Sequence, residues 1–209
     1  KCSAQSFLFV HKNWEEDLLP RLKELASKRK LENLDIGPIL TWTNHQITEH
    51  IDCLLTIPGS KVLFGGKKLL NNSIPPIYGS FQPTALEIPI DKILGDNFKK
   101  ITKEVFGPFQ IIAVYEDKNM QIVKKTLENI SQNLTAAIVS NDVVFQQEIL
   151  ASTVNGTTYS GMKARTTGAP QNHWFGPSGD PRSAGIGTPE AIISTWSSHR
   201  EIIKDVGPL

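Results

Sequence analysis

The stretch FQIIAVYEDKNMQIVKKTLENISQNLTAAIVSNDVVFQQEILASTVNGTTY, residues 109–159, alternates short apolar runs with segments of helical periodicity. The elements predicted in it are a strand over 109–115, a helix over 119–130, a strand over 135–140, a helix over 142–151 and a strand over 153–159. Because parallel strands need crossover connections, this alternation with short joints predicts an α/β fold with a mostly parallel sheet and flanking helices.

The same alternation extends toward the N-terminus of the chain. The earlier predicted elements are a strand over 7–10, a helix with apolar positions within 18–26, a helix with apolar positions within 47–55, a short run over 61–64 and a strand over 84–90. The Pro-Gly pair at 58–59 ends the second helix, and the Gly-Gly pair at 65–66 marks a turn. Residues 71–78 are expected to form an irregular loop.

The character of the sequence changes over 160–187, where glycines, prolines and cationic residues show no periodic apolar pattern. Loops of this length are functional or disordered, and the aromatic residues within this one favour an ordered, functional loop. Thr188, followed by proline, is a typical helix start. We therefore expect one domain over 1–187 that includes this loop, and a C-terminal helix and tail over 188–209.

Composition argues against several classes of function. The 22 basic and 21 acidic residues nearly cancel, so no long-range field attracts nucleic acid or an anionic membrane. No apolar run approaches the roughly 20 residues of a membrane span. Cys2 and Cys53 have no paired or metal-ligand spacing, and His45 and His50 fall on different faces of a predicted helix. We expect no nucleic acid partner, no membrane span and no metal site.

Several short sequence blocks carry more information than composition does. Cys2 lies just before the first predicted strand. Without the blocks that follow it, this cysteine would be interpreted as a small residue of a loop. The blocks that follow it are Ile36-Gly37-Pro38, Gly59 to Gly66, Gln82-Pro83-Thr84, Lys103-Glu104-Val105-Phe106-Gly107-Pro108, Val154-Asn155-Gly156 and Phe175 to Gly187. In this order, along almost the whole chain, they resemble the C-terminal, catalytic-domain portion of the aldehyde dehydrogenases. The block over 103–108 is the most specific.

The resemblance implies a covalent mechanism with NAD as cofactor. Cys2, as a thiolate, would attack the aldehyde carbon, hydride would pass to the nicotinamide, and the resulting thioester would be hydrolysed. The backbone N–H of Cys2 would form half of an oxyanion hole. Glu104 matches the residue that holds the nicotinamide-ribose hydroxyls, and Phe106 lies against the nicotinamide. The alternative for Glu104 is a solvated carboxylate before a turn.

The segment 165–177 resembles the substrate-anchor loop of the glutamate-semialdehyde (pyrroline-5-carboxylate) dehydrogenases of plants and some protists. The resemblance makes Gly168 and Ala169 candidate backbone donors for the substrate α-carboxylate, and Phe175 a candidate contact for its aliphatic part. A surface excursion shaped by glycine and proline is the alternative. The sequence departs from the family pattern at Gly176-Pro177 and in an insertion over 180–182, which leaves the detailed loop geometry open.

The function implied by the resemblance is NAD-dependent oxidation of L-glutamate 5-semialdehyde to L-glutamate in the mitochondrial matrix. The family's cofactor-binding domain, oxyanion-hole asparagine and water-activating glutamate would precede Lys1. We therefore expect an N-terminal half or a partner polypeptide, and a homo-oligomer or larger complex. The alternative is a non-catalytic structural subunit that retains the fold. The presence of Cys2, Glu104 and the anchor loop favours the enzyme.

Overall fold

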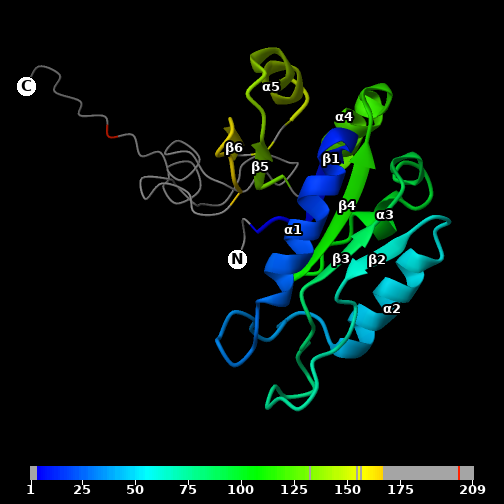
Figure 1. Ribbon diagram of the computed structural model, residues 1–209, viewed down its shortest axis with the longest axis vertical. Helices are drawn as coiled ribbons and strands as arrows, with labels where there is room; N and C mark the ends of the chain where they lie inside the picture. Colours follow the sequence, from blue (N-terminus) through cyan, green and yellow to red (C-terminus); the bar gives the residue numbers. More distant parts are fainter. Residues whose placement is uncertain (1–3, 132, 154, 156, 167–201, 203–209) are drawn as a thin grey trace, which may run out of the picture. The chain divides into compact units, whose positions relative to one another are not determined.

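The structure is a computed structural model that describes residues 4–131, 133–153, 155, 157–166 and 202 (Figure 1). Contacts between residues divide the chain into two compact units, with the boundary between Ile130 and Ser131. Each unit is described by itself below. The domain boundary predicted at 187/188 and the predicted C-terminal helix lie outside the described residues.

The first unit contains a four-stranded sheet with the strand order β1-β4-β3-β2. The strands are β1 (Phe7–His11), β2 (Lys61–Phe64), β3 (Thr84–Glu87) and β4 (Phe109–Tyr115), and the helices are α1 (Glu15–Ser27), α2 (Asn44–Leu55), α3 (Phe98–Ile101) and α4 (Met120–Asn129). β4 is parallel to both β1 and β3, whereas the edge strand β2 is antiparallel to β3. This confirms the predicted α/β fold with a mostly parallel sheet.

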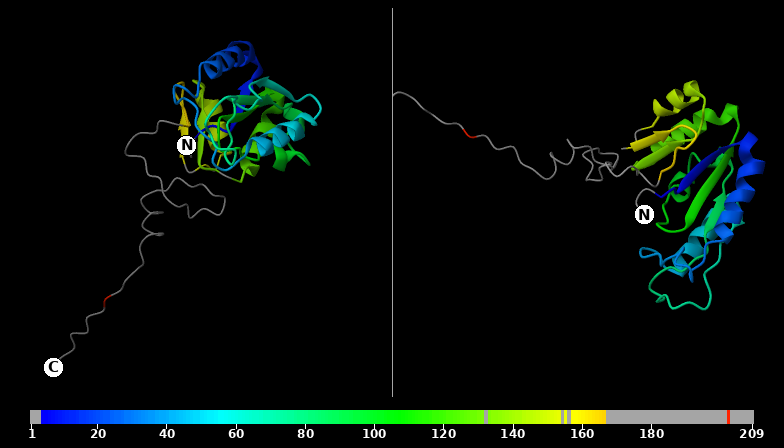
Figure 2. Two further views of the ribbon diagram at one scale, coloured as in Figure 1. Left: turned by 90° about the horizontal axis from the view of Figure 1, so that it is seen from below. Right: turned by 60° about the vertical axis from the view of Figure 1, so that its left-hand side comes forward.

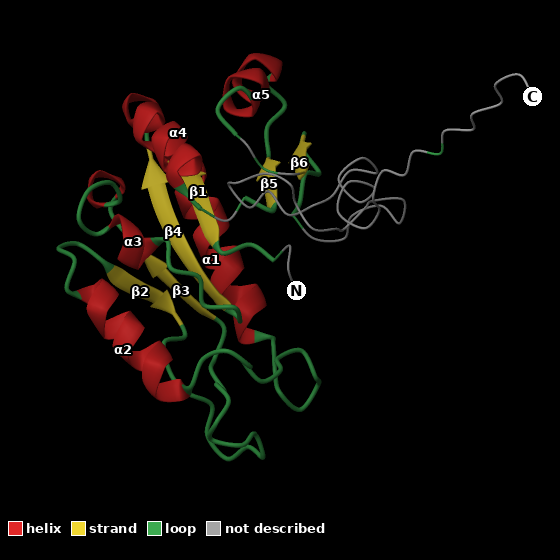
Figure 3. Ribbon diagram, turned by 180° about the vertical axis from the view of Figure 1, so that it is seen from behind, coloured by secondary structure: helices red, strands yellow, loops and turns green. Residues whose placement is uncertain are grey.

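The sheet of the first unit has an apolar core on each face. Along β4, Ile111 and Ala113 belong to one core and Ile112 belongs to the other, because successive strand residues point to opposite faces. Ile47, Ile51 and Leu54 of α2 belong to the core on the first face, and the partly buried Leu18, Leu19 and Leu22 of α1 pack against the core on the second. The sheet therefore lies between α1 and α2, as Figures 2 and 3 show.

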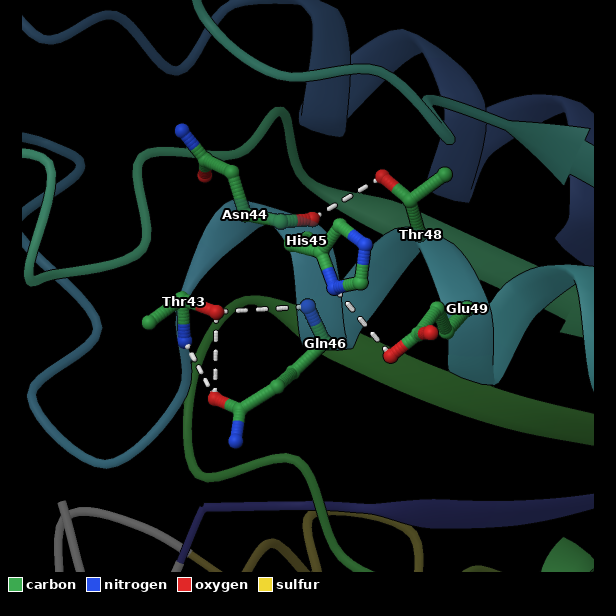
Figure 4. A network of polar contacts seen from close by, with 6 residues as sticks. All are labelled: Thr43, Asn44, His45, Gln46, Thr48 and Glu49. Atoms are coloured by element: carbon green, nitrogen blue, oxygen red, sulfur yellow. Dashed lines mark hydrogen bonds and ion pairs between the residues drawn. The ribbon is translucent and has the colours of Figure 1, made fainter.

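Helix α2 begins at a capping box (Figure 4). The Gln46 backbone N–H donates to Thr43 Oγ1 at 3.3 Å, and the Thr43 backbone N–H donates to Gln46 Oε1 at 2.9 Å. These two bonds satisfy donors that a helix start leaves without intrahelical partners. The cap fixes where α2 starts and hence which of its residues face the sheet.

Replacing Thr43 by alanine is expected to lower the free energy of unfolding by about 1 kcal/mol, because the helix loses its side-chain cap. Thr48→Ala is the matched control, since the Thr48 hydroxyl donates to the Asn44 carbonyl at 2.9 Å within the helix and such a bond adds little to stability. Chemical denaturation of both variants measures the difference. An equal loss in the two variants would contradict a specific role for the cap.

The second unit, as far as the structure describes it, is a β-α-β element. It comprises β5 (Thr135–Ile138), α5 (Val143–Leu150) and β6 (Thr157–Ser160). The two strands are parallel, with Thr135 opposite Thr157. Asp142 caps α5 by accepting from the backbone N–H groups of Val144 and Phe145 at 2.8 and 3.1 Å. This element confirms the parallel crossover predicted from the sequence.

The structure differs from the prediction at two strand boundaries and in one helix, apart from shifts of one or two residues at other ends. β3 stops at Glu87, although residues to 90 continue its alternation, because Pro89 has no N–H to donate and a 3-10 helix follows at Ile90–Lys92. β6 starts at Thr157, four residues later than predicted from 153, since the chain turns at 151–152 after α5. The four-residue helix α3 was not predicted, being too short to show a period. No helix among the described residues is long and apolar enough to span a membrane.

Candidate functional site

The turn between α3 and β4 presents two of the sequence-predicted site residues to solvent. Glu104 is exposed, and Phe106 is 43% exposed. Between them, Val105 is 3% exposed and belongs to the first core. Burying an isopropyl group of this kind stabilises a fold by about 2 kcal/mol. Val105 thereby fixes the turn to the core, while the side chains of Glu104 and Phe106 stay exposed and can contact a ligand.

Close packing at Gly107 fixes the far side of this turn. A Cβ atom added at Gly107 would lie 2.7 Å from Ile39 Cγ1 and 2.8 Å from Ile39 Cδ1. Ile39 is itself held by two backbone hydrogen bonds with Gly79, of 2.7 and 2.9 Å. The Gly107 N–H donates to the Val105 carbonyl at 2.7 Å, and the Phe109 N–H donates to the Gly107 carbonyl at 2.8 Å. Only glycine leaves room for this approach.

A column of four side chains lies against the same turn. The ammonium group of Lys103 lies 4.7 Å from the centroid of the Trp42 ring. The Trp42 ring lies 5.5 Å from the His50 ring, which in turn lies 5.8 Å from the Phe109 ring. We call these four residues the aromatic column. Its members come from the loop before α2, from α2 itself and from the two ends of the turn.

His50 is the buried titratable group of the aromatic column. It is 8% exposed, and its Nε2 atom has no hydrogen-bond partner among the described residues. Burial lowers the pKa of His50 below its usual value, and the positive charge of Lys103 lowers it further. His45, five residues earlier, is exposed, and its Nδ1 atom lies 3.2 Å from Glu49 Oε2 (Figure 4). The prediction that these two histidines face different directions is confirmed.

Two further sequence blocks meet at a glycine corner beside β3. Gly65 has a φ of +72°, and an added Cβ atom would lie 2.1 Å from the Pro83 carbonyl oxygen. The Gly66 backbone N–H donates to Thr84 Oγ1 at 2.9 Å. The Gly-Gly pair is therefore required both for its backbone conformation and for the close approach of the 82–84 block.

The remaining predicted site residues cannot be placed with this turn. Cys2, Gly168, Ala169 and Phe175 lie outside the described residues. Glu104 and Phe106 are the two that the structure brings together, on one turn. An exposed carboxylate accepts hydrogen bonds from hydroxyl groups, and an exposed aromatic ring packs against a planar group. No group of three or more His, Cys, Asp or Glu side chains in the described part of the chain is arranged to hold a metal ion.

Sequence reasoning did not identify Trp42 and His50 as neighbours of the site. A signal for His50 was present, since it falls on the same helical face as Ile47, Ile51 and Leu54. A histidine on the apolar face of a helix is expected to be buried. Trp42 has no comparable signal, because it lies in an irregular loop whose path depends on the pairing of Ile39 with Gly79.

Sequence comparison finds two plant proteins that match the chain from end to end. It is 59% identical over 212 residues to "Delta-1-pyrroline-5-carboxylate dehydrogenase 12A1, mitochondrial" of Arabidopsis thaliana. It is 58% identical over 211 residues to "Probable aldehyde dehydrogenase" of Linum usitatissimum. In both cases the match covers 100% of this chain and 38% of the plant protein. No protein-family model matches the chain.

Comparison with solved structures finds the same fold. The NAD+ complex of an aldehyde dehydrogenase from Bacillus cereus matches with a TM-score of 0.64 and 21% sequence identity. The match covers 90% of this chain and 35% of the bacterial chain. At this identity the likeness shows the fold alone. The chain thus spans a little over a third of the length of the proteins that it matches.

Proposed function

The chain belongs to the aldehyde dehydrogenase family, and we propose that the polypeptide carrying it oxidises an aldehyde with a nicotinamide cofactor. The observation that carries the proposal is 59% identity along the whole chain to a pyrroline-5-carboxylate dehydrogenase. At that identity the fold is retained, and the chemistry depends on the site residues. The matched region is 38% of the relative, so the activity is proposed for the complete enzyme.

For the cofactor, we propose NAD, held in part by Glu104 and Phe106. Bound NAD supplies the hydride acceptor for the oxidation. The exposed Glu104 carboxylate fits the hydroxyls of the nicotinamide ribose, and the exposed Phe106 ring fits the flat nicotinamide. The NAD+ complex of the Bacillus cereus protein with the same fold supports this choice. Val105 and Gly107 hold the two contact residues in place from the core side.

For the nucleophile, we propose Cys2. Its thiolate would attack the carbonyl carbon and form a carbon–sulfur bond, and loss of a hydride from that carbon to the nicotinamide cofactor would leave a thioester. Water would then cleave the thioester to the carboxylic acid and the free thiol. Strand topology supports this role: β1 and β4 are parallel neighbours with Phe7 opposite Ile111, so both strands start at the same edge of the sheet.

For the substrate, we propose L-glutamate 5-semialdehyde, which forms from 1-pyrroline-5-carboxylate. The backbone N–H groups of Gly168 and Ala169 would bind its α-carboxylate, since successive N–H groups form an anion-binding turn. Phe175 would pack against its methylene groups. The printed name of the Arabidopsis thaliana relative supports this substrate, and the same name supports a mitochondrial location. We propose the matrix, and a homo-oligomer as the working assembly.

The substrate proposal predicts a selective effect of enlarging Ala169. In the intact polypeptide, Ala169→Val should raise KM for glutamate semialdehyde by about tenfold, the effect of one misplaced charge-assisted hydrogen bond. KM for NAD should change little, because the cofactor contacts lie on the 102–108 turn. The measurement is NADH formation with glutamate semialdehyde, with propionaldehyde as a substrate that lacks the anchored carboxylate.

Two results would count against the proposal in different ways. An equal rise in KM for both aldehydes would remove the anchor role of Ala169 and leave the dehydrogenase reaction standing. The absence of NADH formation from an intact, folded preparation with either aldehyde would favour the alternative, a non-catalytic subunit with this fold. The family relationship holds in both cases.

A further inference from the structure

We propose that His50 is a positioning residue for the turn that carries Glu104 and Phe106, acting through the aromatic column of Lys103, Trp42, His50 and Phe109. The part of the proposal that concerns NAD rests on the proposed function. The part that concerns the order of the turn rests on the structure of the first unit. Neither part requires His50 to touch a ligand.

The aromatic column holds the turn at both of its ends. Lys103 immediately precedes Glu104 and contacts Trp42 through its ammonium group. Phe109 lies just beyond Gly107 and contacts His50 through its ring. Trp42 and His50 also contact each other. The two ends of the turn are thus joined through one pair of side chains, and Glu104 and Phe106 lie between the joined ends.

His50 is suited to this role only while it is neutral. As a neutral ring it packs between Trp42 and Phe109 without needing a counter-charge. A proton on His50 would place a buried positive charge without a hydrogen-bond acceptor at Nε2. It would also repel Lys103, the charged group that already acts on this ring. Protonation should therefore weaken the contact of Lys103 with Trp42.

The surroundings of His50 offer little to stabilise that proton. Lys99 and Lys100 are the ionisable residues of α3, the helix that packs against α2, and both are basic. On α2 itself, Glu49 lies against His45 on the exposed side of the helix, and Asp52 is exposed. β4 contributes the apolar ring of Phe109. The charges that act on His50 thus favour the neutral ring.

The direction of the pH effect follows from the lowered pKa of His50. The unfolded chain takes up this proton at pH values near 6.5, the ordinary value for histidine, and the folded chain only at lower pH. The contribution of neutral His50 is therefore fully present above about pH 6.5. It is lost as the pH falls from there through the folded pKa. The turn should loosen in the same window.

Hydrogen exchange of the turn in the absence of NAD tests the structural part. In the intact polypeptide, protection of the Gly107 and Phe109 amides, corrected for intrinsic rates, should fall about two- to fivefold between about pH 7.5 and about pH 5.5, the effect of losing one exposed cation–π contact. His50→Phe keeps an aromatic ring and cannot titrate, so its protection should stay constant. His45→Phe, on the exposed face of the same helix, should behave as the unchanged protein does.

A second variant covers the case in which His50→Phe fails to fold. Lys103→Met removes the cation at an exposed position, and should lower protection at about pH 7.5 to the level that the unchanged protein shows at about pH 5.5. Equal protection of the unchanged protein at both pH values would overturn the proposal. The same acid loss in His50→Phe as in the unchanged protein would overturn it too.

NAD binding separates this proposal from the proposed function. The Kd for NAD should rise about two- to fivefold over the same pH interval in the unchanged protein, and should not rise in His50→Phe. The Kd for the aldehyde should not follow this pattern. Turn protection that depends on pH in a protein that fails to bind NAD would confirm the structural part and refute the proposed cofactor. A protein that binds NAD while the protection of its turn does not depend on pH would support the proposed cofactor and refute the structural part.

Discussion

Replacing Cys2 by serine is expected to lower NADH formation by the intact enzyme more than about a thousandfold, because a serine hydroxyl without a base is a poor nucleophile at neutral pH. A thiol ionises within a few pH units of neutrality, and its anion attacks a carbonyl directly. The substitution is nearly isosteric, so NAD binding and the free energy of unfolding should stay unchanged. Activity with glutamate semialdehyde measures the loss, and NAD titration measures the retained binding.

Cys53→Ser provides the matched control. Cys53 is the other cysteine of the chain, and it lies half-buried on α2 with its thiol free. Its replacement should leave kcat within about twofold, since Cys53 belongs to none of the proposed contacts with substrate or cofactor and serine is of nearly the same size. Thiol-directed reagents should inactivate the unchanged protein and Cys53→Ser alike. Full activity of the Cys2→Ser enzyme would show that the nucleophile lies elsewhere.

The positions of most strands and helices could be predicted from the sequence, because the apolar repeat of a strand or a helix depends only on neighbouring residues. The strand over 109–115 and the helices α1, α2, α4 and α5 appear where their apolar spacing predicted them. The direction of β2 was not readable, because a four-residue run carries no information about its partner. The antiparallel pairing of β2 with β3 depends on the loop between Lys68 and Phe81, which reverses the chain, since the bridge between these two residues continues the same pairing past Gly65 and Gly66.

The candidate site was readable only in part. Glu104 and Phe106 were found through a family block, and the structure explains that block: Val105 fills the core and Gly107 packs on Ile39 while the other two residues face solvent. The column beside the turn joins residues far apart in the sequence, such as His50 and Phe109. Such a contact depends on the packing of α2 on the sheet. A periodic pattern identifies the buried face of a helix but not its partner.

The close approach of Gly107 to Ile39 predicts a large effect of the smallest possible substitution. Gly107→Ala would place a Cβ atom 2.7 Å from Ile39 Cγ1, a separation that packed carbon atoms do not reach. Ile39 is 2% exposed and belongs to the first core. We expect the free energy of unfolding to fall by about 1–3 kcal/mol, the usual effect of overpacking. Displacement of the turn should also weaken NAD binding, which titration of the intact enzyme measures.

Two further variants decide whether this contact is the cause. Gly37→Ala introduces the same methyl group where no atom lies within 4 Å, and should leave both stability and NAD binding unchanged. Ile39→Ala removes the two carbon atoms that the new methyl group would meet, at its own cost of about 2–5 kcal/mol for the cavity. Combined with Gly107→Ala, it should destabilise less than the two single losses added together, because the added methyl group occupies part of the cavity. Additive losses would mean that the contact with Ile39 is not the cause of the destabilisation.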